Sequence, residues 1–198
     1  MAIGKSSDTT PYELRGKSVW DDIRFPFAGI NLDTASGRID YNYVDLGVDF
    51  ANNSRYATTE QISMICQMQH DWEIGTDIHP HLHWIQNQDE TPNWLLEYRA
   101  YRNGDAPPAF TTVAYTGNEV TYVSGDLAQI TLFPMIDMSS FTLDTDVSVI
   151  VDLKFFRDTG NTSGKFSGAD AYVGDALSKE FDVHYRRDSV GSRLEYLK

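Results

Sequence analysis

Short stretches of β-forming residues follow one another along most of this chain, and the residues between them interrupt a strand for identifiable reasons. Asparagine and glycine supply positive φ angles there, and proline cannot donate to a strand ladder. The best helical candidate, residues 168–177, contains two glycines and is therefore weak. Interruptions of this kind occur at Asn52 and Asn53, Asn103 to Pro108, Gly117 and Asn118, Ser124 to Asp126, and Gly160 to Gly164.

The stretches between these interruptions predict an all-β fold with antiparallel pairing. Nine short strands without helices between them are typical of a sandwich whose edges are mostly covered. We predict an antiparallel jelly-roll-like β-sandwich, with another β-sandwich topology as the alternative. The predicted strands cover residues 41–49, 60–69, 77–86, 93–102, 110–115, 119–123, 127–133, 147–157 and 179–187.

The length of 198 residues suffices for one substantial core, and β-sandwiches of this size commonly form one domain. We assign residues 20–198 to that domain. Residues 1–19 are polar and contain two glycines and a proline, so we predict an extended N-terminal arm that orders against a partner or its own domain. Residues 158–178 form a long predicted loop, and such loops usually have a function or contact a neighbour.

The charge of the chain limits its partners. With 29 acidic and 16 basic side chains, the formal net charge is −13. Such a surface repels polyphosphates and anionic lipids, so we expect no nucleic acid and no membrane as partner. It favours solubility, and it can also dock on a basic surface of a larger assembly.

Cysteine usage and the N-terminal sequence indicate the compartment. The single cysteine, Cys66, lies in an apolar stretch, and we expect a buried and unreactive thiol. A chain without a possible intramolecular disulfide suits a reducing compartment. The first residues lack the apolar stretch of a signal peptide, so we expect synthesis in the cytoplasm.

The most conspicuous local pattern places a histidine at every second residue, at His79, His81 and His83. On a strand this spacing directs the three imidazoles to one face, while Leu82 and Trp84 point to the other. Imidazoles in a row can bind Zn, Fe or Mn, and His-x-His on a jelly-roll strand is similar to the metal site of cupins. That site also needs an acidic ligand a few residues further on, and residues 85–88 contain none.

We therefore expect no bound metal and no other cofactor, with His79, His81 and His83 as the residual metal-ligand candidates. The alternative role for these histidines is to hydrogen-bond to neighbouring strands or to line a subunit interface, beside His184. The chain has no Gly-x-Ser-x-Gly elbow, no P-loop and no dinucleotide-binding glycine motif, so we predict no catalytic residues. The structural or interface candidates are Trp20, His79, His81, His83, Trp84 and His184.

Aromatic residues make up 13% of the chain and should dominate its core. Trp84, Trp94, Tyr98 and Tyr101 lie on neighbouring predicted strands, where they form either core or a platform that stacks on carbohydrate. Trp94 and Tyr98 have the spacing of a half-buried strand, which favours the core.

Three stretches together resemble a family of structural proteins from tailed bacteriophages. The stretches are residues 20–26, 69–84 and 181–193, and the middle one is the most specific. The resemblance implies a virion protein, made in the host cytoplasm, that decorates the capsid as a jelly-roll cement protein. It further implies a homotrimer at a three-fold position and the major capsid protein or other virion proteins as partners.

Two other functions stay open from the sequence. A tail or head-fibre component that binds a receptor belongs to the same class of virion proteins. A cupin-like metal-dependent enzyme would use the histidine row instead, and stoichiometric bound metal would favour it.

Overall fold

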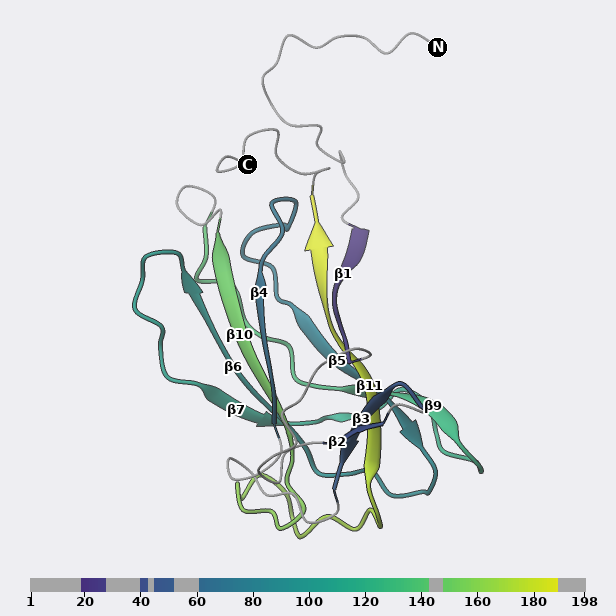
Figure 1. Cartoon of the computed structure of the whole chain (residues 1–198). Helices are drawn as coiled ribbons and strands as arrows, with labels where there is room; N and C mark the ends of the chain where they lie inside the picture. The colour runs from purple at the N-terminus through teal and green to yellow at the C-terminus, as the bar shows by residue number, and fades with distance from the viewer. Residues whose placement is uncertain (1–18, 28–39, 43–44, 52–60, 143–147, 189–198) are drawn as a thin grey trace, which may run out of the picture.

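The molecule consists of two β-sheets packed face to face (Figure 1). Along strands such as β4 (Gln61–Gln67) and β5 (His79–Gln86), buried side chains alternate with more exposed ones. The structure is a computed structural model that describes residues 19–27, 40–42, 45–51, 61–142 and 148–188. In β4 every second side chain is buried, and in β5 Leu82 and Trp84 are buried while His79, His81 and His83 are only partly buried. The predicted division of β5 into two faces is therefore confirmed.

The larger sheet contains seven strands in the order β2-β3-β11-β5-β9-β8, with β1 also paired to β11. All of its pairings are antiparallel. In addition to β5 its strands are β1 (Val19–Pro26), β2 (Asp40–Asn42), β3 (Gly47–Phe50), β8 (Gly117–Asn118), β9 (Leu127–Leu132) and β11 (Ala176–Arg187).

The smaller sheet has four antiparallel strands in the order β4-β10-β6-β7. Besides β4 they are β6 (Trp94–Arg102), β7 (Thr111–Ala114) and β10 (Val149–Arg157). The main strands β3-β11-β5-β9 of one sheet and β4-β10-β6-β7 of the other have the order of a jelly roll, in which successive strands cross between two sheets. The prediction of an all-β, jelly-roll-like sandwich is confirmed.

No helix occurs among the described residues, and accordingly none there is long and apolar enough to cross a membrane. Residues 168–177, the best helical candidate, form a loop and the start of β11.

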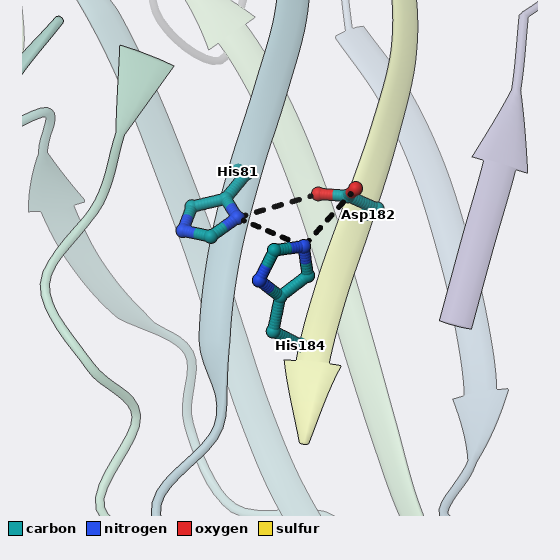
Figure 2. A group of neighbouring side chains, drawn as sticks. All are labelled: His81, Asp182 and His184. Atoms are coloured by element: carbon teal, nitrogen blue, oxygen red, sulfur yellow. Dashed lines mark hydrogen bonds and ion pairs between the residues drawn. The ribbon is translucent and has the colours of Figure 1, made fainter. Parts of the chain in front are cut away.

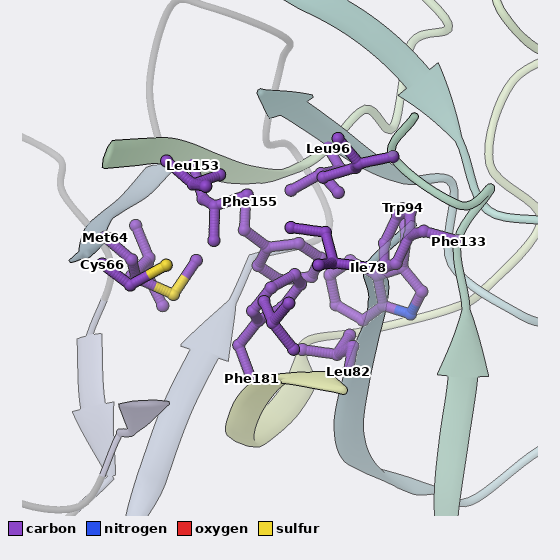
Figure 3. Packing of buried hydrophobic residues seen from close by; sticks show 14 of the residues in the cluster. Met64, Cys66, Ile78, Leu82, Trp94, Leu96, Phe133, Leu153, Phe155 and Phe181 are labelled. Atoms are coloured by element: carbon purple, nitrogen blue, oxygen red, sulfur yellow. The ribbon is translucent and has the colours of Figure 1, made fainter. Parts of the chain in front are cut away.

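Aromatic rings from both sheets fill the space between them (Figure 3). The ring of Phe155 on β10 lies 4.9 Å from that of Trp94 and 5.1 Å from that of Phe50 on the larger sheet. Trp84 and Trp94 are fully buried and meet edge to face, with centroids 5.8 Å apart. These two tryptophans therefore belong to the core and cannot form an exposed platform for carbohydrate.

β11 connects most of the larger sheet. One of its edges pairs with β5, while the other pairs first with β3 and then with β1. The approach of β3 is close, because a Cβ atom on Gly47 would lie 2.6 Å from the carbonyl oxygen of Ser178. Only glycine allows this contact.

Two strands differ from the sequence prediction. β1 lies outside the predicted strands, and its Ile23 and Phe25 pack on the core. Pro26 is tolerated because it ends a strand whose only pairing among the described residues is with β11. The predicted strand at 119–123 is wrong: the ladder is made by Gly117 and Asn118, and residues 119–123 are not in a strand.

The predicted arm lies outside the described residues except for Val19, which begins β1. The predicted strand at 41–49 is divided into β2 and β3 by a turn in which Leu46 has a φ of 51°.

A buried arginine takes part in holding the predicted loop at 158–178 on its own domain, together with Asn93. Arg157 is fully buried at the end of β10, and its guanidinium donates to the carboxylate of Asp170 at 2.9 Å. It also donates to the carbonyl oxygens of Tyr172 and Gly174 in the loop and of Phe50 in β3. The loop is therefore fastened to the end of β10, where Arg157 also reaches β3, and β11 begins at residue 176.

Candidate functional site

The outer face of the larger sheet carries rows of ionisable side chains across β1, β11 and β5. The antiparallel register places His81 opposite Asp182 and His79 opposite His184. On the other side of β11, Asp22 lies opposite His184. Because alternate residues of a strand share a face, these side chains all point away from the core.

Three of these side chains form the centre of the site (Figure 2). We call His81, Asp182 and His184 the His–Asp cluster. Nδ1 of His81 lies 3.4 Å from Nε2 of His184 and 3.6 Å from Oδ1 of Asp182. Nε2 of His184 lies 3.5 Å from Oδ2 of Asp182. The two imidazole rings meet edge to face, with an interplanar angle of 90°.

Two further side chains contact the His–Asp cluster directly. Nε2 of His83 lies 3.1 Å from Oδ2 of Asp182, and Oδ1 of Asp22 lies 3.1 Å from Nε2 of His184. The carboxylate of Asp182 is thus oriented by β5, and the imidazole of His184 is approached by β1.

Next to the His–Asp cluster, β1 makes an aromatic contact with β5 and an ion pair with β11. The indole of Trp20 meets the imidazole of His79 edge to face, with centroids 4.8 Å apart. Arg24 forms a two-pronged ion pair with Glu180, in which Nη2 donates to Oε2 at 2.8 Å. Such fork-like pairs fix orientation, so β1 is fastened to β11 by side chains as well as by its ladder.

Burial and neighbouring charges separate the histidines electrostatically. Burial, and then the nearby His184, lowers the pKa of His81 to about 4, so this imidazole is neutral near pH 7. The pKa of His79 is also lowered, first by burial and then by His184. In contrast, the hydrogen bond to Asp182 raises the pKa of His83. His81 and His83, two residues apart on β5, therefore differ in proton affinity.

Asp182 is the most buried member of the site. Its side chain is 4% exposed, and among the described residues its Oδ1 atom makes no hydrogen bond. An acceptor that is buried without a partner costs free energy, which makes it an unusual feature of a folded protein.

The arrangement suits ligation or pairing better than nucleophilic catalysis. A nucleophile activated by a base requires a hydroxyl, thiol or amine next to the imidazole, whereas the His–Asp cluster offers a second imidazole there. Two imidazole nitrogens and a carboxylate can instead hold a metal ion or a chain of hydrogen bonds.

The structure brings together most of the candidates from the sequence. Trp20, His79, His81, His83 and His184 all lie on the outer face of the three neighbouring strands β1, β11 and β5. Trp84 lies on the opposite face of β5, where its indole donates to the hydroxyl of Thr131 at 2.8 Å.

Sequence reasoning missed Asp182, although its position two residues before His184 was a usable signal. The argument against a metal site was that no carboxylate follows the histidines along β5. The structure removes that argument, because Asp182 reaches His81 across the ladder from β11.

Comparison with protein family models, with curated proteins and with solved structures finds no match to this chain.

Proposed function

We propose that this chain is a structural virion protein of a tailed bacteriophage, which decorates and stabilises the capsid as a cement protein. The main support is that the three stretches that resemble such proteins come together in the fold. Residues 20–26 lie in β1, residues 69–84 lead into and include most of β5, and residues 181–187 belong to β11. These three strands are neighbours in one sheet.

Stretches that are far apart in the sequence therefore build one continuous surface. His79, His184 and Asp22 follow one another across the three strands of this surface. If the resemblance reflects a common task, that task belongs to this outer face, and we assign the contact with the virion to it.

Two general properties of the molecule agree with this role. The net charge of −13 favours docking on a basic region of a capsid shell, and it keeps copies of the protein soluble before assembly. A jelly roll also leaves few free strand edges, which limits uncontrolled association. We propose the major capsid protein as the main partner and no enzymatic activity.

The number of copies per particle tests this proposal. Virions of the phage that encodes the chain would be purified and analysed by quantitative mass spectrometry, with the major capsid protein as internal standard. We expect hundreds of copies per particle. A few copies would assign the chain to the tail or to head fibres, and its absence from virions would refute a virion role altogether.

A further inference from the structure

The three donor atoms of the His–Asp cluster can enclose a single ion. One nitrogen of His81, one nitrogen of His184 and one carboxylate oxygen of Asp182 lie within 4.8 Å of one another. Two imidazoles and a carboxylate are a ligand set that zinc and related ions use in proteins. We propose that His81, Asp182 and His184 bind one divalent transition-metal ion on the outer face of the larger sheet.

The distances suit an ion between the side chains better than direct hydrogen bonds. Zinc lies about 2.0–2.2 Å from imidazole nitrogen and carboxylate oxygen, so neighbouring ligands of a tetrahedral ion are about 3.4 Å apart. The two imidazole nitrogens are 3.4 Å apart, Oδ1 of Asp182 lies 3.6 Å from the His81 nitrogen, and its other oxygen, Oδ2, lies 3.5 Å from the His184 nitrogen. Hydrogen bonds from nitrogen are usually about 2.9–3.0 Å long.

One small movement completes the geometry. The widest separation among the three donor atoms is as much as 4.8 Å, which exceeds the spacing of adjacent ligands. The final torsion of an aspartate side chain has a broad energy minimum, so the carboxylate can rotate at little cost. The backbone need not move.

The buried carboxylate of Asp182 provides an independent observation. Its side chain is 4% exposed, and Oδ1 makes no hydrogen bond among the described residues, although it faces His81. A cation between the two side chains would satisfy this oxygen. His83 meanwhile lies within hydrogen-bonding distance of the other oxygen, at 3.1 Å, which is the kind of outer support that metal-binding carboxylates usually have.

The scaffold holds the donors in place and leaves one side open. His81 and Asp182 are register partners on β5 and β11, and the inner faces of these strands are anchored in the core by Leu82 and Val183. Sites on strands are held more rigidly than sites on loops. The His184 side chain is 34% exposed, so an ion can enter from solvent.

A fourth ligand is within reach on the open side. Oδ1 of Asp22 on β1 lies 3.1 Å from Nε2 of His184, and water is the alternative ligand. With Asp22 included, the ion would connect all three strands of the proposed virion-contact surface. The metal site itself does not depend on that function, because it follows from the geometry of the donors alone.

The donor types also predict selectivity. Magnesium and calcium prefer oxygen ligands, whereas two of the three donors here are nitrogens. The site should therefore accept Zn²⁺ or Co²⁺ and discriminate against Mg²⁺.

The test uses the full chain without a polyhistidine tag, freed of metal by a chelator. Calorimetric titration with Zn²⁺ should give one ion per chain, and Mg²⁺ at the same concentration should give no saturable signal. Co²⁺ should produce the visible absorption bands of a low-coordinate site. His184→Gln should weaken Zn²⁺ binding by at least about tenfold, while His70→Gln, which removes a partly exposed imidazole outside the cluster, should not.

Two controls separate loss of a ligand from loss of the fold. The nearly isosteric Asp182→Asn should also weaken binding, and each variant should show a cooperative thermal transition without metal. Zn²⁺ should raise the melting temperature of the unmodified protein and of His70→Gln, but not that of His184→Gln or Asp182→Asn. The proposal is refuted if the unmodified protein gives no saturable binding, or if both cluster variants bind Zn²⁺ as tightly as it does.

Discussion

Leu82 lies in the middle of β5 with its side chain fully buried between the sheets, opposite Phe181 in the register (Figure 3). Replacing it by alanine should leave a cavity in a packed core and lower the free energy of unfolding by about 2–5 kcal/mol. Chemical denaturation measures this loss.

Ile65→Ala is the matched control for that measurement. Ile65 lies on the outer face of β4 and is 70% exposed, so its truncation should cost less than about 0.5 kcal/mol. An equally small loss for Leu82→Ala would contradict the burial of the inner face of β5.

Cys66 should be chemically silent in the folded protein. Burial, and then the charge of Asp152, raises the pKa of its thiol to about 12. The thiolate is the reactive form, and a free thiol ionises near pH 8.5. Raising the pH from 7 to 9 should therefore accelerate the reaction with Ellman's reagent strongly in denaturant and hardly at all in the native protein. Rapid labelling of the native protein at pH 9 would contradict this burial.

At the scale of residues, the sequence predicted on which face of a strand a side chain lies, but not which residues of other strands lie beside it. The strict alternation of His79, His81 and His83 with apolar residues was sufficient to divide β5 into an outer and an inner face. The partner strand was not contained in that pattern, because the period of a strand says nothing about which other strand lies beside it. The contact between His81 and Asp182 therefore required the structure.

At the scale of elements, the loop of residues 158–175 depends on Arg157. Replacing Arg157 by methionine keeps the volume of the side chain but leaves the carboxylate of Asp170, which is 1% exposed, without its cation. Removing one partner of a buried pair typically costs about 3–5 kcal/mol, and we expect a loss of that size in the free energy of unfolding.

The pair of Arg99 and Asp152 provides the comparison for the loop prediction. It lies on the outer face of the smaller sheet, and the side chain of Arg99 is 27% exposed. Arg99→Met should cost less than Arg157→Met, because water reaches this pair from the side of Arg99, although Asp152 is itself only 10% exposed. A similar loss for both variants would mean that Arg157 does not anchor the loop.

Most elements were predictable because turn residues mark their ends, but β1 and β8 were not. No strand was predicted over residues 19–26, whereas Pro26 ends a strand that pairs, among the described residues, with β11 alone. Gly117 and Asn118 were taken as a break, whereas this pair makes the short ladder with β9. Local propensity cannot distinguish such edge positions from turns, since the difference lies in the tertiary neighbours.

At the scale of the whole molecule, the arm should contribute to attachment and not to folding. We expect that a chain lacking residues 1–18, which keeps all of β1, has an unchanged thermal transition but co-sediments less with undecorated capsids. An arm that orders on its partner gives up conformational entropy there, and several linked copies offset that cost. Undiminished binding by the folded, shortened protein would refute the role of the arm.

The same reasoning predicts self-association, and a trimer is the form that we propose. Sedimentation equilibrium of the full chain should give three times the mass of the 22.4 kDa chain at working concentration. A monomer would remove avidity as the explanation for the proposed attachment to a capsid shell.

The position of β11 in the sheet has a consequence for how the protein is made. β11 follows all other described strands along the chain, yet β1, β3 and β5 all pair with it. The ion-paired residues Arg24 and Glu180 are 156 positions apart. A nascent chain therefore presents these three strands before their common partner has left the ribosome, and such distant pairings form slowly. The larger sheet can close only after residues 176–187 have been synthesised, so a chain that stops before them exposes unpaired strand edges to aggregation.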